Sequence, residues 1–264
     1  MFENLNEHRI NKSYLSNGYV IEKSEEKEAL RQIRSVFIKN INRLLPKTKN
    51  KKDDFVLNNI HKFIDLKDLN SFRLEIIHKI NNTNNFKKNF FKVSKKMVES
   101  IVGNELVMQT KINLSIQIPK DDSSLLPVHA DTWSGLSPFE SVVLIPLVDC
   151  FKTKSMFILP ANKSKKIDKI FNQKKLKTTK DIFKYIKKDI KWLKINYGQI
   201  LIFDQTLPHG NVINKENETR WTMNCRFKSV FTPYKDKKIG EFYEPITLKP
   251  ATKRGLNYKF PNEK

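Results

Sequence analysis

The chain has 264 residues, 39% of them hydrophobic, which is enough to fill the core of one large β-rich domain. Its 50 basic residues against 28 acidic ones give a net charge of +22, and this raises the question of nucleic-acid binding. Because only eight are arginines and the lysines are spread over every segment, we interpret the charge as a solvated surface. We therefore expect any DNA or RNA binding to be nonspecific and lost at moderate salt.

The sequence carries no sign of secretion or of a membrane segment. The opening stretch MFENLNEHRINKS lacks the apolar core of a signal peptide, and no run approaches the ~18 apolar residues of a membrane span. The two cysteines, Cys150 and Cys225, lie inside apolar runs, which is typical of buried thiols in a reducing compartment. We expect a cytoplasmic protein without a disulfide framework.

Helical periodicity dominates residues 1–104. Residues 14–21 predict a turn at Gly18 that leads into a short strand. Ser24 is a plausible N-cap for the next helix. Apolar residues then recur at spacings of three and four, at Leu30, Ile33, Phe37, Ile41 and Leu44. Shorter amphipathic pieces follow up to residue 101.

From Val107 onwards the apolar period changes to the two-residue period of strands. Further strand-like runs cover residues 141–150, 155–159, 192–196, 199–204 and 221–231, and a lysine-rich helical insertion covers 161–190. This profile predicts an α+β protein whose core, residues 105–232, is a double-stranded β-helix, the jelly-roll form shared with cupins. The N-terminal helices would pack on one sheet. Residues 233–264 would form a tail along the surface of this single domain.

The residues around His129 suggest a metal site. His129 and Asp131 are two positions apart at the end of a strand, so their side chains leave the backbone on the same side. His209 follows another apolar strand much further along the chain. Two histidines and one carboxylate on one face of an Fe(II) ion leave the other positions open to substrates and O₂, as in non-haem iron oxygenases.

An arginine strengthens this interpretation. Arg220 begins the strand after His209, and Thr222 lies on the same face two residues later. A buried guanidinium presents two parallel donors to a carboxylate, so Arg220 could anchor a dicarboxylate whose other end reaches the metal.

The stretch LPVHADTWSGLSPFESVVLIPLVDCFKTKSMFILP, residues 126–160, resembles the Fe(II)- and 2-oxoglutarate-dependent oxygenases, in particular the phytanoyl-CoA dioxygenase-like branch. More narrowly, it looks like the StrG-type oxygenases of bacterial carbohydrate gene clusters, including that for streptomycin. The resemblance implies that His129, Asp131 and His209 bind iron. It also implies that Arg220 and Thr222 hold the distal carboxylate of 2-oxoglutarate. The retained Asp131 argues against a halogenase.

Further site residues follow from the same resemblance and from strand parity. Asn211 stands where the family often has a serine that touches the cosubstrate, so this position departs from the pattern. The substrate would be a small molecule, such as a sugar or nucleotide sugar, and the oligomeric state cannot be deduced. Candidate substrate contacts are Thr132 and Trp133, directly after Asp131, Asn113 and Gln117 on the polar face of one strand, and Arg226, which shares the strand parity of Arg220 and could meet an anionic group.

Two other classes of function stay open. The first is a cupin-like, metal-dependent sugar isomerase or epimerase that uses no 2-oxoglutarate. Arg220 separates the two: its loss should abolish turnover in an oxygenase and matter less in an isomerase. The second is a nucleic-acid-binding or nucleic-acid-modifying protein, which the charge of +22 suggests. The polar face of the strand at residues 111–117 is ambiguous as well, because it would be solvated in a sandwich and would line the cavity in a metal-containing barrel.

Overall fold

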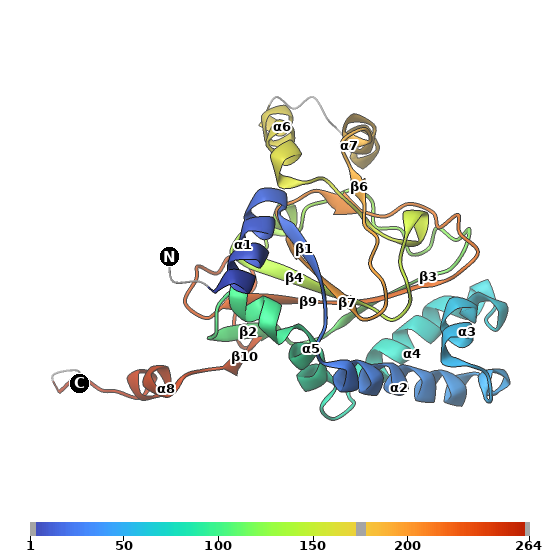
Figure 1. Cartoon of the computed structure of the whole chain (residues 1–264), viewed down its shortest axis with the longest axis horizontal. Coiled ribbons are helices and arrows are strands. Elements are labelled where there is room, and N and C mark those ends of the chain that lie inside the picture. Colours follow the sequence, from blue (N-terminus) through green and yellow to red (C-terminus); the bar gives the residue numbers. More distant parts are fainter. Residues whose placement is uncertain (1–3, 173–177, 262–264) are drawn as a thin grey trace.

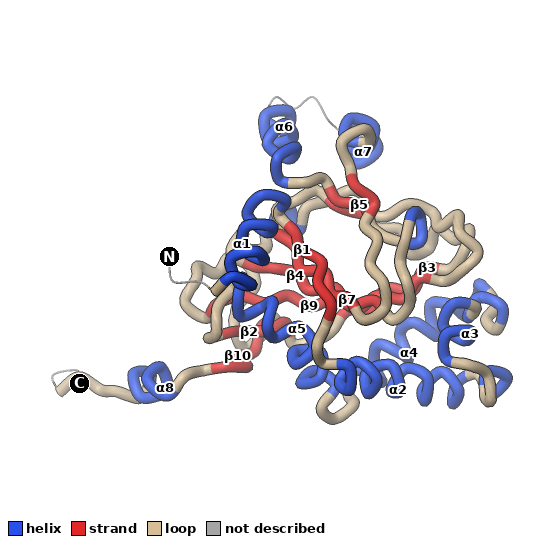
Figure 2. Tube along the Cα trace, in the orientation of Figure 1, coloured by secondary structure: helices blue, strands red, loops and turns tan. Residues whose placement is uncertain are grey.

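Two antiparallel sheets form the centre of the molecule, and helices lie on either side of them (Figures 1 and 2). The computed structural model describes residues 4–172 and 178–261. The helices are α1 (Leu5–Asn17), α2 (Lys27–Leu44), α3 (Asp53–Asn58), α4 (Leu69–Asn81), α5 (Phe86–Ile101), α6 (Ala161–Asn172), α7 (Thr179–Ile186) and α8 (Pro250–Leu256). The strands are β1 (Tyr19–Lys23), β2 (Leu106–Gln109), β3 (Asn113–Gln117), β4 (Glu140–Pro146), β5 (Phe157–Ile158), β6 (Lys191–Trp192), β7 (Gln199–Asp204), β8 (His209–Gly210), β9 (Arg220–Ser229) and β10 (Tyr243–Thr247).

The larger sheet has the order β1-β7-β4-β9-β2-β10, and β3 also pairs with β9. Strand β9 is ten residues long and pairs along one side with β4. Its other side pairs with β3 over its first half and with β2 near its end. The smaller sheet has the order β6-β5-β8. The mixed helix and antiparallel-strand content agrees with the α+β class expected from the sequence.

The larger sheet is apolar on the face toward the helices and mixed on the opposite face. On β4, Val143 and Ile145 join the core with the N-terminal helices, whereas Val142 and Leu144 pack with residues of β5. On β9 the residues of the helical face are Trp221, Met223, Cys225 and Phe227. The alternate residues of β9 are polar or charged: Arg220, Thr222, Asn224 and Arg226. One row of polar side chains therefore points into the space between the two sheets.

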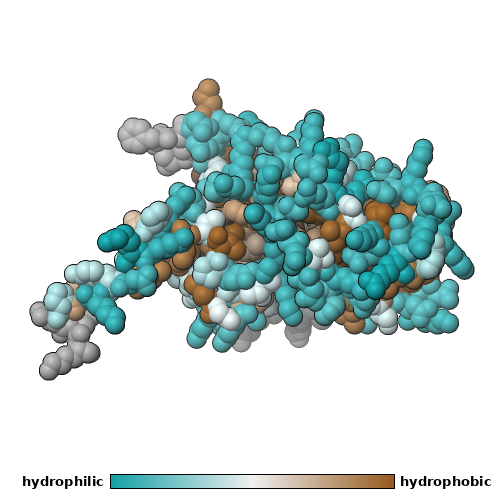
Figure 3. Space-filling model, turned by 90° about the horizontal axis from the view of Figure 1, so that it is seen from below, coloured by the Kyte–Doolittle hydropathy of each residue, from teal (hydrophilic) through white to brown (hydrophobic). Residues whose placement is uncertain are grey.

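The N-terminal helices cover the sheet as expected. Helix α2 buries Leu30, Ile33, Phe37 and Ile41 from the predicted stripe. Ser24 lies just before this helix, where its hydroxyl accepts from the Glu26 amide at 3.2 Å and donates to the Val93 carbonyl at 3.1 Å. The outer face of the helix layer is mostly hydrophilic, with apolar patches between charged side chains (Figure 3). None of the helices in the described parts of the chain is long and apolar enough to cross a bilayer.

Two stretches differ from expectation. Residues 14–17, predicted as a turn, belong to helix α1, which the Asn4 side chain caps at its start and Gly18 ends with φ +77°. Residues 243–247 of the predicted surface tail form β10, which pairs with β2 and fully buries Tyr243. Beyond β10, α8 and the following residues extend away from the body (Figure 1). The predicted helical insertion contains α6 and α7, and its residues 173–177 lie outside the described part.

Candidate metal centre

His129 and His209 come together through a backbone bridge between distant segments. The amide of His129 donates to the carbonyl of His209 at 2.9 Å, and the reverse bond measures 2.8 Å. Side chains directly opposite each other in an antiparallel pair lie on the same face, and the two ring centroids are 4.4 Å apart. Strand β8 also pairs with β5, so the smaller sheet fixes the position of His209.

Both imidazoles are oriented by a backbone carbonyl. Nδ1 of His129 lies 2.8 Å from the Pro127 carbonyl, and Nδ1 of His209 lies 2.9 Å from the Leu207 carbonyl. A carbonyl only accepts, so each Nδ1 carries a proton, and Nε2 is the nitrogen that holds the lone pair when the ring is neutral. Such bonds fix the tautomer and the ring angle of metal-binding histidines.

Asp131 completes the cluster from the turn after His129. Its amide donates to the Gln205 carbonyl at 3.0 Å, which fixes the start of this short 3₁₀ turn, Asp131–Ser134. Its Oδ1 lies 3.7 Å from Nε2 of His129. One ligand atom from each of His129, Asp131 and His209 lies within 4.8 Å of the others. The predicted triad is therefore assembled in a geometry that one metal ion can bridge.

Burial keeps His209 uncharged. The loss of hydration, with a smaller contribution from the neighbouring His129, lowers the pKa of the His209 imidazole to about 4. Metal binding requires the neutral imidazole, so protons do not compete at this nitrogen near neutral pH. His209 is 7% exposed, as is Asp131, so this side of the cluster is shielded from solvent.

A cavity of about 280 Å³ adjoins the triad between the two sheets. Of the residues predicted for cosubstrate or substrate, the cavity is lined by Asn113, Asn211, Arg220, Thr222 and Arg226. Its apolar wall includes Val142, Leu144, Met156 and Phe203. The polar face of β3 thus faces a cavity, which resolves the ambiguity left by its alternating pattern.

Arg220 is a buried cation without an acidic partner among the described residues. Its side chain is 4% exposed, and Nη2 of its guanidinium donates to the Ser115 hydroxyl at 2.7 Å. Nε is buried and has no hydrogen-bond partner. Burial lowers the pKa of Arg220, but arginine stays protonated at neutral pH. An uncompensated buried charge is costly, so this geometry suits an anionic ligand.

Asn211 has a structural contact as well as a place in the cavity wall. Its Oδ1 accepts from the Leu126 amide at 2.8 Å, and its Nδ2 donates to the Ser124 carbonyl at 3.4 Å. These bonds tie the segment before His129 to the segment after His209. Thr222 is 3% exposed and lies on β9 between the two cavity-lining residues Arg220 and Asn224.

Three predicted substrate contacts do not line the cavity. Gln117 is buried opposite Arg220, and its Nε2 donates to the Val212 carbonyl at 2.6 Å. Thr132 and Trp133 follow Asp131 in the 3₁₀ turn, where Trp133 is 43% exposed. Gln117 is thus bonded within the protein, and Trp133 faces outward rather than into the cavity.

Three residues at the site were not predicted from the sequence. Ser115 shares the polar face of β3 with Asn113, and that alternation was the signal that could have identified it. Asn224 lines the cavity, and its Oδ1 accepts from Nδ2 of Asn113 at 3.1 Å. Gln205 bonds the side chain of Arg226, and nothing in the local pattern marked it.

Comparison with known proteins gives a likeness in structure. No protein family and no curated protein matches the sequence. The solved structure of the non-heme monooxygenase ThoJ in its apo form matches with a TM-score of 0.51 at 13% identity, over 94% of this chain and 92% of that one. The chain shares its fold.

Two further solved structures match comparably. SnoN, a non-heme alpha-ketoglutarate-dependent epimerase from nogalamycin biosynthesis, has a TM-score of 0.50 at 14% identity, over 91% of this chain and 92% of that one. HygX from Streptomyces hygroscopicus, solved with nickel and 2-oxoglutarate, has a TM-score of 0.51 at 10% identity, over 88% and 89%. At such low identity the likeness establishes the common fold, and the function rests on the site.

Proposed function

We propose that this chain is a non-haem Fe(II)- and 2-oxoglutarate-dependent dioxygenase that oxidises a small molecule. The proposal depends mainly on the buried guanidinium of Arg220, which has no acidic partner among the described residues. It lies in the same cavity as the cluster of His129, Asp131 and His209. A metal site alone would serve many chemistries. A metal site that shares its cavity with a buried receptor for a carboxylate matches a dicarboxylate cosubstrate that binds at both ends.

The proposal includes the architecture. The two sheets would be the halves of a double-stranded β-helix, with the site between them, within one domain built from residues 1–104, 105–232 and 233–264. The alternating faces of β4 and β9 and the likeness to the three solved structures support this arrangement.

The chain's residues would bind and orient the reactants. Nε2 of His129, Nε2 of His209 and Oδ1 of Asp131 are the atoms that fit Fe(II), because the other ring nitrogens and Oδ2 are bonded elsewhere. Bound Fe(II), together with 2-oxoglutarate and O₂, supplies the oxidative chemistry. HygX was solved with 2-oxoglutarate bound, and SnoN depends on alpha-ketoglutarate, which is the same compound.

Arg220 would receive the distal carboxylate of 2-oxoglutarate. Nε is free for this contact, and Ser115 already orients Nη2 from the neighbouring strand. Thr222 lies two residues further on the same face of β9 and lines the same cavity. Asn211 would contribute mainly by holding the segment at Leu126, which forms part of the cavity wall.

The substrate would be a hydroxyl-bearing small molecule, and we propose a carbohydrate or a sugar-derived metabolite. The cavity carries amide and hydroxyl groups at Asn113, Asn224 and Ser115, which donate and accept as hydroxylated ligands require. Its charged lining is confined to Asp131, Arg220 and Arg226 among the described residues, and the metal and cosubstrate would occupy the first two.

Binding of 2-oxoglutarate tests the proposal against an isomerase that uses no cosubstrate. The assay is calorimetric titration of the Co(II)-loaded protein with 2-oxoglutarate. We expect Arg220→Met to weaken binding by at least ~2 kcal/mol, roughly 30-fold, because the carboxylate loses a buried charged partner. Arg34→Met is the matched control: Arg34 is also buried with an unpartnered Nε, but it pairs with Asp54 and lies outside the cavity.

Equal affinity of wild type and Arg220→Met, or no binding to either, would contradict the proposal. The second result would favour the metal-dependent isomerase.

A further inference from the structure

Arg226 is the second arginine of the cavity, and its guanidinium is bonded entirely within the protein. Nη2 lies 2.8 Å from Oδ2 of Asp131. Nη1 donates to Oε1 of Gln109 at 3.1 Å, and Nε donates to Oε1 of Gln205 at 3.3 Å. The anion that Arg226 meets is thus a carboxylate of its own chain, and an anionic substrate group would have to displace it.

The two carboxylate oxygens of Asp131 have different partners. Oδ2 contacts Arg226, whereas Oδ1 is the oxygen near Nε2 of His129. The Asp131 amide is fixed separately by the Gln205 carbonyl, so backbone and side chain are both restrained. Side-chain exposure is 13% for Arg226 and 8% for Asp131, and at this burial solvent screens the pair only weakly.

A second layer of hydrogen bonds fixes the group that supports Arg226. Nε2 of Gln205 donates to the Glu140 carboxylate at 2.8 Å and to the Ser137 carbonyl at 2.6 Å, which turns Oε1 toward Arg226. The other oxygen of Glu140 accepts from the Ser137 amide at 3.1 Å. Gln205 and Glu140 are 0% and 2% exposed. A buried network with satisfied partners is rigid, so it can hold the guanidinium in one place.

We infer that Arg226 is a positioning residue that confines Asp131 to binding the metal through Oδ1 alone. The inference rests on the proposed function. A carboxylate that bound through both oxygens would occupy a coordination position that 2-oxoglutarate or O₂ needs. By retaining Oδ2, Arg226 keeps that position open. The two cavity arginines therefore differ in role: Arg220 faces the cosubstrate, and Arg226 controls a ligand of the metal.

The arrangement of the metal's ligands, rather than affinity alone, tests the inference. The guanidinium is a cation beside a cation site, so its removal would by electrostatics alone strengthen metal binding. Release of Oδ2 would act in the same direction, because Asp131 could then offer a second ligand atom. A changed ligand arrangement in an Arg226 variant would therefore report lost positioning, since the loss of charge alone leaves the set of ligands unaltered.

The experiment is titration of the protein with Co(II), whose visible absorption reports the number and arrangement of its ligands. The variants are Arg226→Met and Arg226→Lys, with Arg34→Met as the control for loss of a buried, ion-paired arginine outside the cavity. We expect the Co(II) complex of Arg226→Met to show a shifted and weaker visible absorption band, because a released Oδ2 raises the number of ligands, and to bind 2-oxoglutarate more weakly than the wild type. Arg226→Lys keeps the charge and folds more readily than Arg226→Met, and its spectrum should lie between those of the wild type and Arg226→Met. The control should match the wild type.

The outcomes separate the inference from the function on which it rests. An unchanged spectrum in Arg226→Met, at any affinity for Co(II), would overturn the inference and leave the proposed function standing. If the wild type itself binds neither Co(II) nor 2-oxoglutarate, the proposed function fails and the inference fails with it. A purely structural role would lower the stability of the variants without changing the spectrum of the bound metal, which would also count against positioning.

Discussion

At the residue scale, the pair formed by Asp131 and Arg226 links the metal site to the stability of the fold. Each charge compensates the other at a largely buried position. In the metal-free protein we expect Asp131→Ala to lower the free energy of unfolding by about 3 kcal/mol, because it leaves the Arg226 guanidinium without its counter-charge. The double variant Asp131→Ala/Arg226→Met removes both charges and should recover most of this loss.

Urea unfolding followed by circular dichroism measures both free energies. Additive losses in the double variant would show that the pair is not coupled. The coupling also matters for assays, because inactivity of Asp131→Ala would mix lost metal binding with lost stability. His129→Gln is a cleaner substitution, since among the described residues the His129 ring bonds a backbone carbonyl and has a weak contact with Asp131.

The triad could be predicted from the sequence because two of its members, His129 and Asp131, are neighbours in the chain. His129 and Asp131 are two residues apart, so strand parity placed them together, and His209 was assigned because it follows an apolar strand. In the structure Asp131 lies in a 3₁₀ turn rather than at the predicted strand end. The Asp131–Arg226 pair could not be foreseen, because it depends on how the turn after His129 meets β9. The cavity position of Arg226 was predicted, whereas its partner belongs to the tertiary structure.

At the scale of elements, the turn between α1 and β1 depends on Gly18. Its φ of +77° is left-handed, and a Cβ built there would come within 2.4 Å of the Leu207 side chain. We expect Gly18→Ala to destabilise the protein by more than the ~1 kcal/mol of left-handed strain alone. Gly198→Ala is the matched control, because Gly198 has φ +93° and open space around it.

Thermal unfolding compares the two variants directly. Equal losses for Gly18→Ala and Gly198→Ala would mean that Leu207 simply moves aside. Because Leu207 also provides the carbonyl that orients His209, a shift there should weaken Co(II) binding in Gly18→Ala and leave it unchanged in Gly198→Ala.

Long periodic elements were predictable and the C-terminal edge strand was not. Helix α2 repeats its apolar residues over many positions, so its period is clear. The long run at residues 221–231 predicted strand β9, although its alternation is less clean. Strand β10 is only five residues long and contains Pro245, which argues against a strand from sequence alone. Proline is nevertheless tolerated at the edge of a sheet, and β10 lies at the edge of the larger one.

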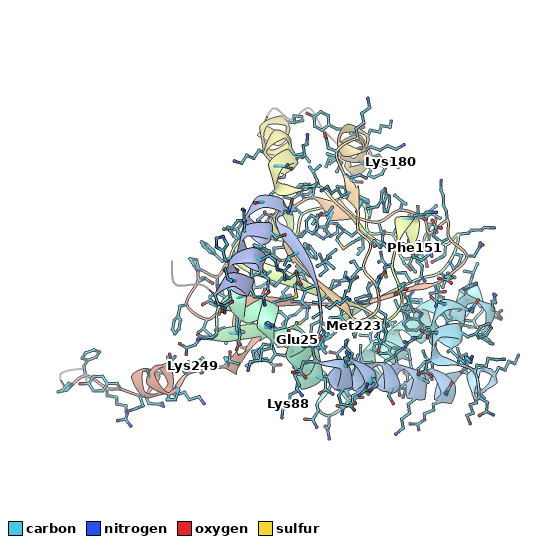
Figure 4. The ribbon with its side chains drawn as sticks, in the orientation of Figure 1. Glu25, Lys88, Phe151, Lys180, Met223 and Lys249 are labelled. Atoms are coloured by element: carbon cyan, nitrogen blue, oxygen red, sulfur yellow. The ribbon has the colours of Figure 1, made fainter. Side chains whose placement is uncertain are left out.

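At the scale of the whole molecule, charge is dispersed and the cysteines are enclosed. The labelled Lys88 on α5, Lys180 on α7 and Lys249 just before α8 lie at the periphery, whereas Met223 lies in the interior (Figure 4). This arrangement agrees with the interpretation of the basic residues as a solvated surface. The cysteines of the chain, Cys150 and Cys225, are both free and buried.

Burial also makes the thiols unreactive. It raises the pKa of Cys150 to about 11 and that of Cys225 to about 12, so at pH 8 only about one thiol in a thousand or fewer is ionised. We expect neither cysteine of the folded protein to react with an aromatic disulfide reagent at pH 8, and both to react in guanidinium chloride. Rapid reaction of either thiol under native conditions would contradict the structure around it.

The central claim is that one cavity binds Fe(II) and 2-oxoglutarate for oxidation. The most direct test is succinate formation from 2-oxoglutarate with Fe(II) and O₂, comparing the wild type with His129→Gln, Arg220→Met and the control Arg34→Met. We expect succinate from the wild type and the control, and none from the two site variants. Succinate from Arg220→Met at the wild-type rate, or no succinate from a wild type that also fails to bind 2-oxoglutarate, would contradict it.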